Sequence, residues 1–171
     1  MSLTAIEQRD QTGPAKVEVL TAARGNSYPA GRMLISTPRE VDAIVRRIPE
    51  GRVLAIGALR AALARDHQAD YACPRTTDAF LRIVADAAEE ERAAGRGPLA
   101  PYWRVVCDDG TLSDKLPGGD GAQARRLEGD GVHVLHLGKR YLLSDVEHYA
   151  WSPPPLGKAG RGRPPDPRRK R

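Results

Sequence analysis

The sequence is poor in aromatic residues, with five Tyr, two Trp and one Phe among 171 residues. A core must therefore be built largely from Val, Leu, Ile and Ala, and the 40% share of hydrophobic residues permits one such domain. Cysteine is also scarce, because Cys73 and Cys107 could form one bridge at most and no disulfide framework. The four histidines have no metal-ligand spacing with a cysteine pair. We therefore expect neither a metal ion nor a cofactor.

Long hydrophobic runs are missing as well. The N-terminal stretch MSLTAIEQRDQTGPAK has no apolar core of a secretory signal. No segment approaches the roughly 18 consecutive apolar residues of a membrane span. These absences lead us to expect a soluble, cytoplasmic protein with no membrane partner.

The positive charge is confined to one end of the chain. The net charge is +5, from 27 Lys/Arg and 22 Asp/Glu. Residues 152–171 hold seven basic residues and one Asp, a local charge of +6, which leaves 20 basic and 21 acidic residues and a charge of −1 elsewhere. A uniformly basic domain is thereby excluded. We predict a flexible lead-in at residues 1–31, a folded domain at 32–151 and a disordered Pro/Arg-rich tail at 152–171.

Three helices are predicted in the first two thirds of the domain. Thr37-Pro38-Arg39-Glu40 is a capping box with proline at the first helical position, and an apolar stripe at helical spacing follows it up to Ile48. A second helix is expected at about residues 57–66. A third is expected to begin at Thr76 or Thr77, both good N-caps, and its far end, residues 89–91, is interpreted as a solvated acidic face.

The pattern then changes to strands. Residues 103–107 are β-rich, and Asp108-Asp109-Gly110 is interpreted as turn chemistry. A short helix is expected at about residues 122–128, and a hairpin pairs residues 132–137 with 140–144 around Gly138-Lys139. Three helices followed by a hairpin predict an α+β fold, a winged helix-turn-helix. That outline alone does not define a function.

Local motifs give a more specific indication. Ile48-Pro49-Glu50-Gly51-Arg52-Val53 followed by Ile56-Gly57, and later Pro101-Tyr102-Trp103-Arg104-Val105-Val106, resemble the patterns I-P-x-G-x-V-x-T-Y-G and P-C-H-R-V-[VI]. Both belong to the C-terminal domain of the O6-alkylguanine-DNA alkyltransferase family. Asp109-Gly110, Gly118-Gly119, Leu127 and Asp130-Gly131-Val132 follow in the family's order. The resemblance covers residues 37–132.

The residues that carry the family's chemistry are replaced. The alkyl-accepting cysteine is Tyr102 here, the histidine is Trp103 and the glutamate is Asp130. An alkyl acceptor needs a thiolate, whereas a phenol has a pKa near 10 and an indole cannot act as a base. The resemblance thus implies a divergent alkyltransferase-like protein that binds a lesion without removing it. Ile56, Tyr102, Trp103 and Asp130 are the expected pocket residues, and Ile56 replaces a tyrosine that contacts the phosphate of the flipped nucleotide.

The resemblance also places the expected DNA contacts. Arg75 corresponds to the arginine that enters the base stack, and Thr76 and Thr77 would expose helix-terminal amides to a phosphate. Arg104 is a further expected DNA contact. In the tail, Arg161-Gly162-Arg163-Pro164 is the core of an AT-hook, a motif that lies in the A·T minor groove. A plain basic tail that attracts phosphates is the alternative for this segment.

The interpretation that follows is a non-enzymatic, nucleoid-associated protein that recognises a modified or flipped base in double-stranded DNA. It would act in DNA repair, with a repair protein as partner, or as a chromosomal binding factor. Two alternatives stay open. The chain could be an enzyme that uses Cys73 or Tyr102 as a displaced nucleophile. It could instead be a regulatory module whose pocket has closed, which the −1 charge outside the tail favours.

Overall fold

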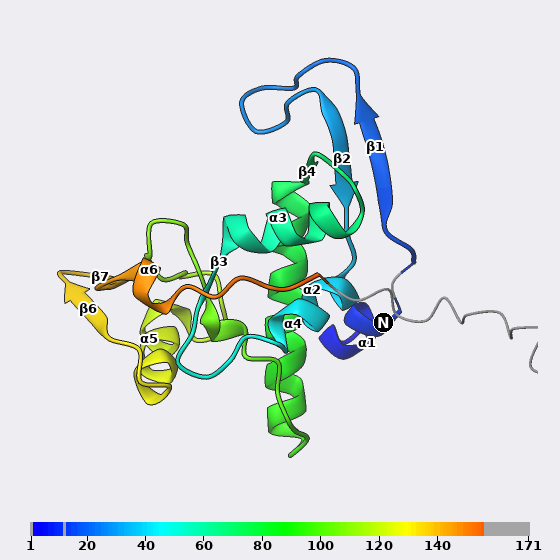
Figure 1. Cartoon of the computed structure of the whole chain (residues 1–171). Coiled ribbons are helices and arrows are strands. Elements are labelled where there is room, and N and C mark those ends of the chain that lie inside the picture. The colour runs from blue at the N-terminus through cyan, green and yellow to red at the C-terminus, as the bar shows by residue number, and fades with distance from the viewer. Residues whose placement is uncertain (1, 12, 156–171) are drawn as a thin grey trace, which may run out of the picture.

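The computed structural model describes residues 2–11 and 13–155 (Figure 1). Arg161 and Arg163, with the AT-hook predicted around them, lie outside the described residues. No helix within the described part is both long enough and apolar enough to cross a membrane. The helices are α1 Ala5–Asp10, α2 Pro38–Val45, α3 Ile56–Asp66, α4 Pro74–Ala93, α5 Gly119–Gly129 and α6 Val146–Tyr149, with the 3-10 helix η1 Tyr102–Arg104. The strands are β1 Lys16–Leu20, β2 Gly31–Ile35, β3 Leu54–Ala55, β4 Tyr71–Ala72, β5 Val105–Val106, β6 Val134–Leu137 and β7 Arg140–Leu143.

The helical half is an apolar core built by α2, α3 and α4. The capping box at the start of α2 is confirmed, because Glu40 N–H donates to Thr37 Oγ1 at 3.2 Å and Thr37 N–H donates to the Glu40 carboxylate at 3.1 Å. The predicted helices α2 and α3 are both present. The stripe that follows the box is almost fully buried: Val41, Ile44, Val45 and Ile48. Local capping and periodicity were sufficient to predict these elements.

Helix α4 begins earlier than predicted. Pro74 takes the first turn and Cys73 stands at the N-cap, so Thr76 and Thr77 are not caps. Both threonines instead donate their hydroxyls back to the carbonyl of Cys73, at 3.3 Å and 2.8 Å. Thr77 is completely buried. The reason is that proline favours the first helical turn, where its missing N–H costs nothing.

The other half contains the predicted wing, seen on the left of Figure 1. Strands β6 and β7 pair antiparallel from Val134↔Leu143 to Leu137↔Arg140 around the predicted two-residue turn. Helix α5 packs against the wing, and the two share a second apolar cluster that includes Val53, Val106, Ala124, Leu127, Val132, Val134 and Leu143. The described residues thus form an α+β fold with a helical half and a winged half.

The strand predicted at residues 103–107 is mostly wrong. Tyr102 and Trp103 belong to η1, and only Val105 and Val106 form a strand, which pairs parallel with β3. The two aromatic rings therefore do not alternate across a sheet but meet edge to face, with centroids 5.5 Å apart. The side chain of Gln123 favours the tight turn by donating to the carbonyls of Trp103 and Val105, at 3.0 Å and 2.7 Å.

The N-terminal segment is ordered, which corrects the flexible lead-in predicted at residues 1–31. A capping box of Thr4 and Glu7 starts α1, and β1 pairs antiparallel with β2 over five residues. Strand β2 in turn pairs parallel with β4, giving a three-stranded sheet in the order β1-β2-β4. The short apolar run at residues 17–20 carries too little local information to reveal partners this distant in sequence.

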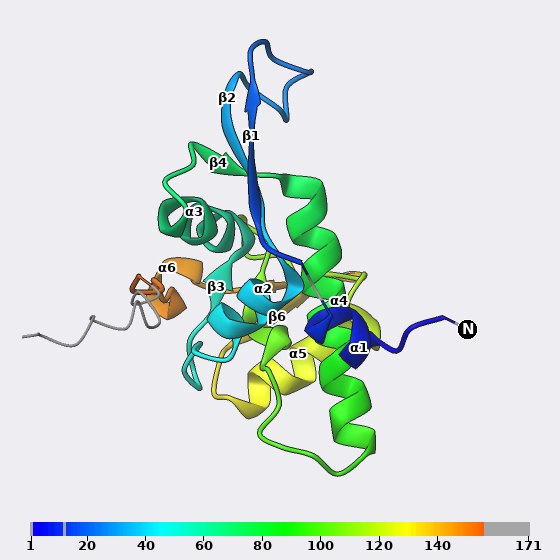
Figure 2. The same ribbon diagram turned by 90° about the vertical axis from the view of Figure 1, so that its right-hand side faces the viewer.

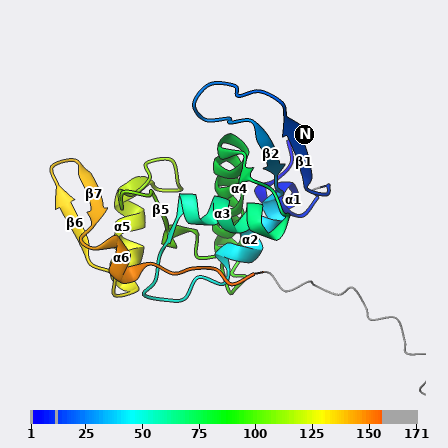
Figure 3. The same cartoon turned by 45° about the horizontal axis from the view of Figure 1, so that its top comes forward.

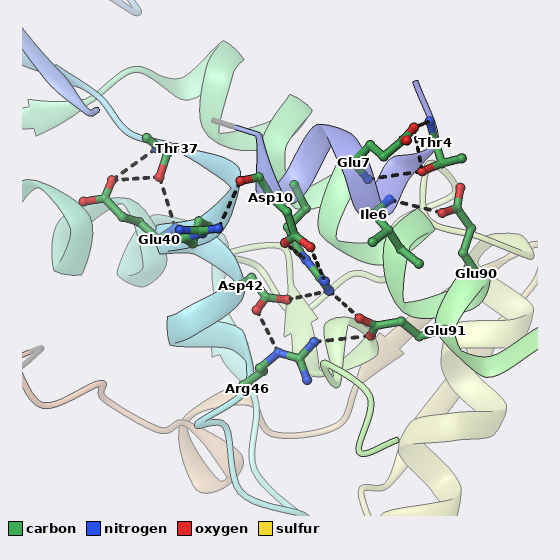
Figure 4. Close-up of polar contacts among 12 residues, drawn as sticks. Thr4, Ile6, Glu7, Asp10, Thr37, Glu40, Asp42, Arg46, Glu90 and Glu91 are labelled. Atoms are coloured by element: carbon green, nitrogen blue, oxygen red, sulfur yellow. Dashed lines mark hydrogen bonds and ion pairs between the residues drawn. The ribbon is translucent and has the colours of Figure 1, made fainter. Parts of the chain in front are cut away.

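Helix α1 is docked on the acidic end of α4, next to α2 (Figure 2). The Glu90 carboxylate accepts hydrogen bonds from the backbone amides of Ala5 and Ile6, at 2.8 Å and 3.1 Å. The Glu91 carboxylate binds Arg9 Nη1 at 2.7 Å and Arg46 Nη2 at 3.3 Å (Figure 4). The solvated acidic face predicted here is therefore wrong, because these carboxylates bind the other elements.

Order also extends beyond Trp151. The carbonyls of Pro153 and Pro154 accept hydrogen bonds from Arg65 Nη1 and Arg47 Nη2, at 3.1 Å and 3.2 Å. Pro153 is buried. A proline carbonyl is a strong acceptor although the residue has no N–H to donate, so a polar, proline-rich stretch can still be held against arginines.

Breaking the Glu91 contacts should destabilise the fold. We expect Glu91→Gln to lower the free energy of unfolding by about 2 kcal/mol, or Tm by about 4–8 °C, because Arg9 and Arg46 both lose the carboxylate that bridges them, although Arg9 keeps Asp10 and Arg46 keeps Asp42. Glu128→Gln is the matched control, since its contact with His136 is exposed at the surface and such pairs contribute about 0–1 kcal/mol. Thermal unfolding monitored by circular dichroism measures both. Equal Tm values for the two variants would contradict the prediction.

Candidate nucleic-acid interface and base cavity

An open cavity of about 370 Å³ lies between α3, α4, β5 and the loop at residues 112–116. Its wall is apolar and its lining also includes charged side chains of both signs. The lining residues are Ile56, Arg60, Asp78, Leu81, Arg82, Val105, Val106, Cys107, Leu112, Ser113, Asp114, Lys115 and Leu116. A largely apolar cavity with a few polar groups is the usual form of a small-molecule or base-binding site.

The wall formed by α3 is fixed by a contact from the turn after β5. Asp108 Oδ1 accepts a hydrogen bond from the backbone N–H of Gly57 at 2.8 Å, which satisfies an otherwise unpaired amide at the helix start. A Cβ at position 57 would lie 2.8 Å from the same oxygen, so the glycine of the sequence motif is needed for this close approach. Asp108 therefore holds a distant helix in addition to lying in the turn. Asp109 has the role expected of a turn residue, because it accepts a hydrogen bond from the N–H of Thr111.

The loop at residues 112–116 is positioned by Gln123, which the sequence analysis missed. This side chain is 2% exposed, and its oxygen accepts from the Ser113 N–H at 2.9 Å while its nitrogen donates to the η1–β5 turn. One amide thus links α5 to two walls of the cavity. Gln123 could have been found from the sequence as a polar residue that directly precedes Ala124 on the apolar side of a short helix.

Tyr102, one of the expected pocket residues, is packed in the core. The ring is 2% exposed, and its hydroxyl donates to Glu89 Oε1 at 2.8 Å. Burial, together with the hydrogen bond to Glu89, raises the pKa of Tyr102 well above its ordinary value of 10. Arg126 binds the same carboxylate oxygen at 2.5 Å. Burial raises the pKa of Glu89, but the hydrogen bonds from Tyr102 and Arg92 outweigh it and leave the pKa lowered.

Trp103 and Asp130, at the other two relay positions, contact each other. Trp103 Nε1 donates to Asp130 Oδ2 at 3.0 Å, and the guanidinium of Arg126 lies 4.6 Å above the indole ring. Arg104 binds both oxygens of Asp130, at 2.6 Å and 3.1 Å, and donates to the Ile48 carbonyl at 2.8 Å. The Arg104 side chain is only 13% exposed, so it joins η1 to α2 and α5 and is not placed to contact DNA.

The four predicted pocket residues therefore do not share this cavity. Ile56 lines it, whereas Tyr102, Trp103 and Asp130 do not. Cys73 is also outside the cavity, in a separate apolar cluster with Leu20 and Met33, and so is not near enough to act on its contents. Cys107 is the cysteine that lines the cavity, and its thiol is free.

The predicted DNA-facing turn is only partly accessible. Arg75 is exposed in the first turn of α4, Thr76 is half-buried, and Thr77 is inaccessible. One turn further on, Asp78 forms an ion pair with Arg60 at 2.6 Å across the α3–α4 contact. This pairing offsets the charge that Asp78 brings to the cavity.

These contacts predict that the chain accepts no methyl group from O6-methylguanine in DNA. Tyr102→Cys should not restore transfer, because Trp103 supplies no base and Asp130 is bound by Arg104. Intact-protein mass spectrometry after incubation with a methylated duplex tests this, with an active alkyltransferase as positive control. A methyl adduct on the wild type would contradict this prediction.

The same contacts predict an effect on stability. Tyr102→Phe should lower the free energy of unfolding by about 1–2 kcal/mol, since Glu89 loses a buried donor.

Comparisons with known proteins give structural matches only. No protein-family model matches the chain, and no curated protein sequence does. Among solved structures, S. pombe Atl1 in complex with damaged DNA containing O6-carboxymethylguanine is similar with 22% identity, and S. pombe ATL in complex with DNA with 24%. Each match covers 68% of this chain and 94% of the other, with a TM-score of 0.49.

Proposed function

We propose that this protein binds double-stranded DNA with the first turn of α4 and receives a modified or extruded base in the cavity, without transferring a group to itself. It would mark the lesion for a repair partner. The proposal rests on the sequence resemblance over residues 37–132 and on the geometry of the cavity.

One observation carries the proposal: the cavity is open, although the positions of the acceptor relay are filled by packed residues. Tyr102 is bound by Glu89, and Asp130 is bound by Trp103 and Arg104, all outside the cavity. Ile56 and the aliphatic residues around it leave a space of about 370 Å³. Binding and chemistry are therefore separable in this chain, and the features retained are those that suit binding.

Basic side chains near the cavity favour binding of a nucleic acid, although the net charge outside the tail is −1. Arg82 and Lys115 line the cavity and are exposed, and Arg75 is exposed in the first turn of α4. Asp78 is paired with Arg60, so one of the two carboxylates at the cavity is already neutralised. A local basic patch can attract phosphates even when the net charge of the domain is near zero.

The two rival interpretations make distinct demands. A regulatory module with a closed pocket has no use for the cavity, and its affinity for intact and damaged DNA would be equal. An enzyme with a displaced nucleophile would have to use Cys107, because Cys73 does not line the cavity. No histidine lines the cavity to activate that thiol.

The decisive experiment compares Arg75→Ala with the wild type on three duplexes: intact, O6-alkylguanine-containing and abasic. If Arg75 fills the space of an extruded nucleotide, the variant should lose about 1–3 kcal/mol on the damaged duplexes, the scale of one stacking contact, and much less on the intact duplex. Fluorescence anisotropy measures the affinities. Arg96→Ala is the matched control, because Arg96 is exposed just beyond the other end of α4.

Each other outcome has a definite meaning. Equal loss on all duplexes would reduce Arg75 to a phosphate contact, and no loss would exclude it from the interface. No preference of the wild type for damage would favour the regulatory module, and an adduct on Cys107 would favour the enzyme.

The tail is proposed to tether the domain to DNA. Residues 156–171 carry seven basic residues and one acidic residue. The contacts that hold the preceding segment, such as that of Arg47 with the Pro154 carbonyl, lie within residues up to 155. Deleting them should flatten the slope of log affinity against log salt by about 4–5 if four to six phosphates are contacted, and leave Tm unchanged. In an AT-hook, Arg161→Ala with Arg163→Ala would weaken A·T-rich binding selectively. An unchanged slope would exclude the tether.

A further inference from the structure

The β1–β2 hairpin is joined directly to the helix that carries Arg75. Strand β2 pairs with β4 through Met33↔Tyr71 and Leu34↔Ala72, and the N–H of Cys73, at the N-cap of α4, donates to the Leu34 carbonyl at 2.8 Å. Figures 1 and 3 show the hairpin projecting past this end of α4. A duplex that meets the first turn of α4 would therefore lie beside the hairpin.

The hairpin is held rigidly in that position. Leu20, Met33 and Cys73 form a small buried cluster at its base. Nearer its tip, Tyr71 Oη donates to the Pro29 carbonyl at 2.8 Å, and the Asp70 carboxylate accepts from the N–H of Arg32 at 2.7 Å. A rigid arm loses little conformational entropy on binding a ligand.

Close packing beside the loop adds to this rigidity. Gly31 has φ +138°, and a Cβ there would lie 2.7 Å from Asp70 Oδ2. Glycine is favoured at this positive φ, and the absence of a Cβ leaves room for the Asp70 carboxylate. The arm is therefore built to keep one orientation relative to α4.

The arm carries a net positive charge, because Lys16, Arg24 and Arg32 outnumber Glu18. From residue 19 to residue 39 there are three arginines and no carboxylate, although Asp and Glu number 22 in the whole chain. Arg39 lies beyond the arm and donates to the Asp10 carbonyl at 3.0 Å. Arg24 and Arg32 belong to the arm itself and are exposed, and the loop between the strands adds exposed Thr21, Asn26 and Ser27. Such a surface is complementary to phosphates.

The arm is less suited to a protein partner. Val19, 65% exposed, is the one large apolar side chain of the arm described as strongly exposed, which is far too little for a stable protein interface. Lys16 and Glu18 are charged residues on the outer strand β1, and such charges oppose pairing with a further strand.

We propose that the β1–β2 hairpin is a second DNA-contacting element, whose loop at residues 21–30 lies along the phosphate backbone of the duplex that flanks the base bound at α4. The inference rests on the proposed DNA-binding function. The arm fixes the direction in which the duplex leaves the cavity, because the parallel pairing with β4 sets its angle to α4.

The test uses full-length protein with Arg24→Ala, since the Arg24 side chain forms no hydrogen bond or ion pair within the described residues and its backbone hydrogen bond to Tyr28 survives the change. Affinity for an O6-alkylguanine duplex should fall about fivefold, and the salt slope should flatten by about 0.9, the value of one phosphate. Arg96→Ala is the control and should change neither. Tm should be the same for all three proteins.

Duplex length provides an independent measurement. The duplex is shortened at one end or at the other, and the two losses of affinity are compared. For the wild type, shortening one end should reduce the affinity more than shortening the other, and Arg24→Ala should remove this difference. If the wild type binds no duplex, the proposed function fails. If it binds and discriminates damage while Arg24→Ala equals Arg96→Ala, the function stands and the hairpin inference is overturned. Unchanged DNA affinity with altered self-association in sedimentation would likewise overturn it and assign the arm to a second copy.

Discussion

The fold depends most on the three consecutive carboxylates near the C-terminal end of α4. Glu89 binds Tyr102 and Arg126, Glu90 accepts from the first amides of α1, and Glu91 binds Arg9 and Arg46. Successive residues of a helix point about 100° apart, so three in a row can reach three directions around the axis. One turn of α4 thereby fixes α1, α2, η1 and α5.

This arrangement assigns different tasks to the two ends of α4. At the C-terminal end, carboxylates and guanidinium groups satisfy one another, and little charge remains there for a ligand. At the N-terminal end, the helix macrodipole is positive and Arg75 is exposed. The arrangement also pairs the carboxylates of Glu89, Glu90 and Glu91 with groups of the same domain, so these three charges are engaged in internal contacts.

The features that sequence reasoning predicted correctly are those with short-range causes. The capping box of Thr37 and Glu40 and the two-residue turn of the wing each involve residues within a few positions of one another. The features that it missed depend on distant partners. Glu90 and Ala5 are 85 residues apart, and Asp108 and Gly57 are 51 residues apart. An acidic triplet or an Asp-Asp-Gly turn looks the same in sequence whether it faces water or binds another element. The residues of the candidate site were predicted least well, because a residue's position in a motif does not determine which cavity its side chain lines.

The tyrosine at position 102 shows how a large polar side chain is accommodated in the core. A tyrosine is much larger than a cysteine and introduces a hydroxyl that needs a partner when buried. Glu89 meets that need, and Arg126 in turn offsets the charge of Glu89 and lies over the neighbouring indole at 4.6 Å. The substitutions at 102 and 103 are thus coupled through one carboxylate and one guanidinium. Returning a cysteine to position 102 would leave a void beside the core and remove a donor from Glu89, and it would still provide no base. Tyr102, Trp103, Glu89 and Arg126 thus form one packed polar cluster, and the walls of the cavity beside it are held by Asp108 and Gln123.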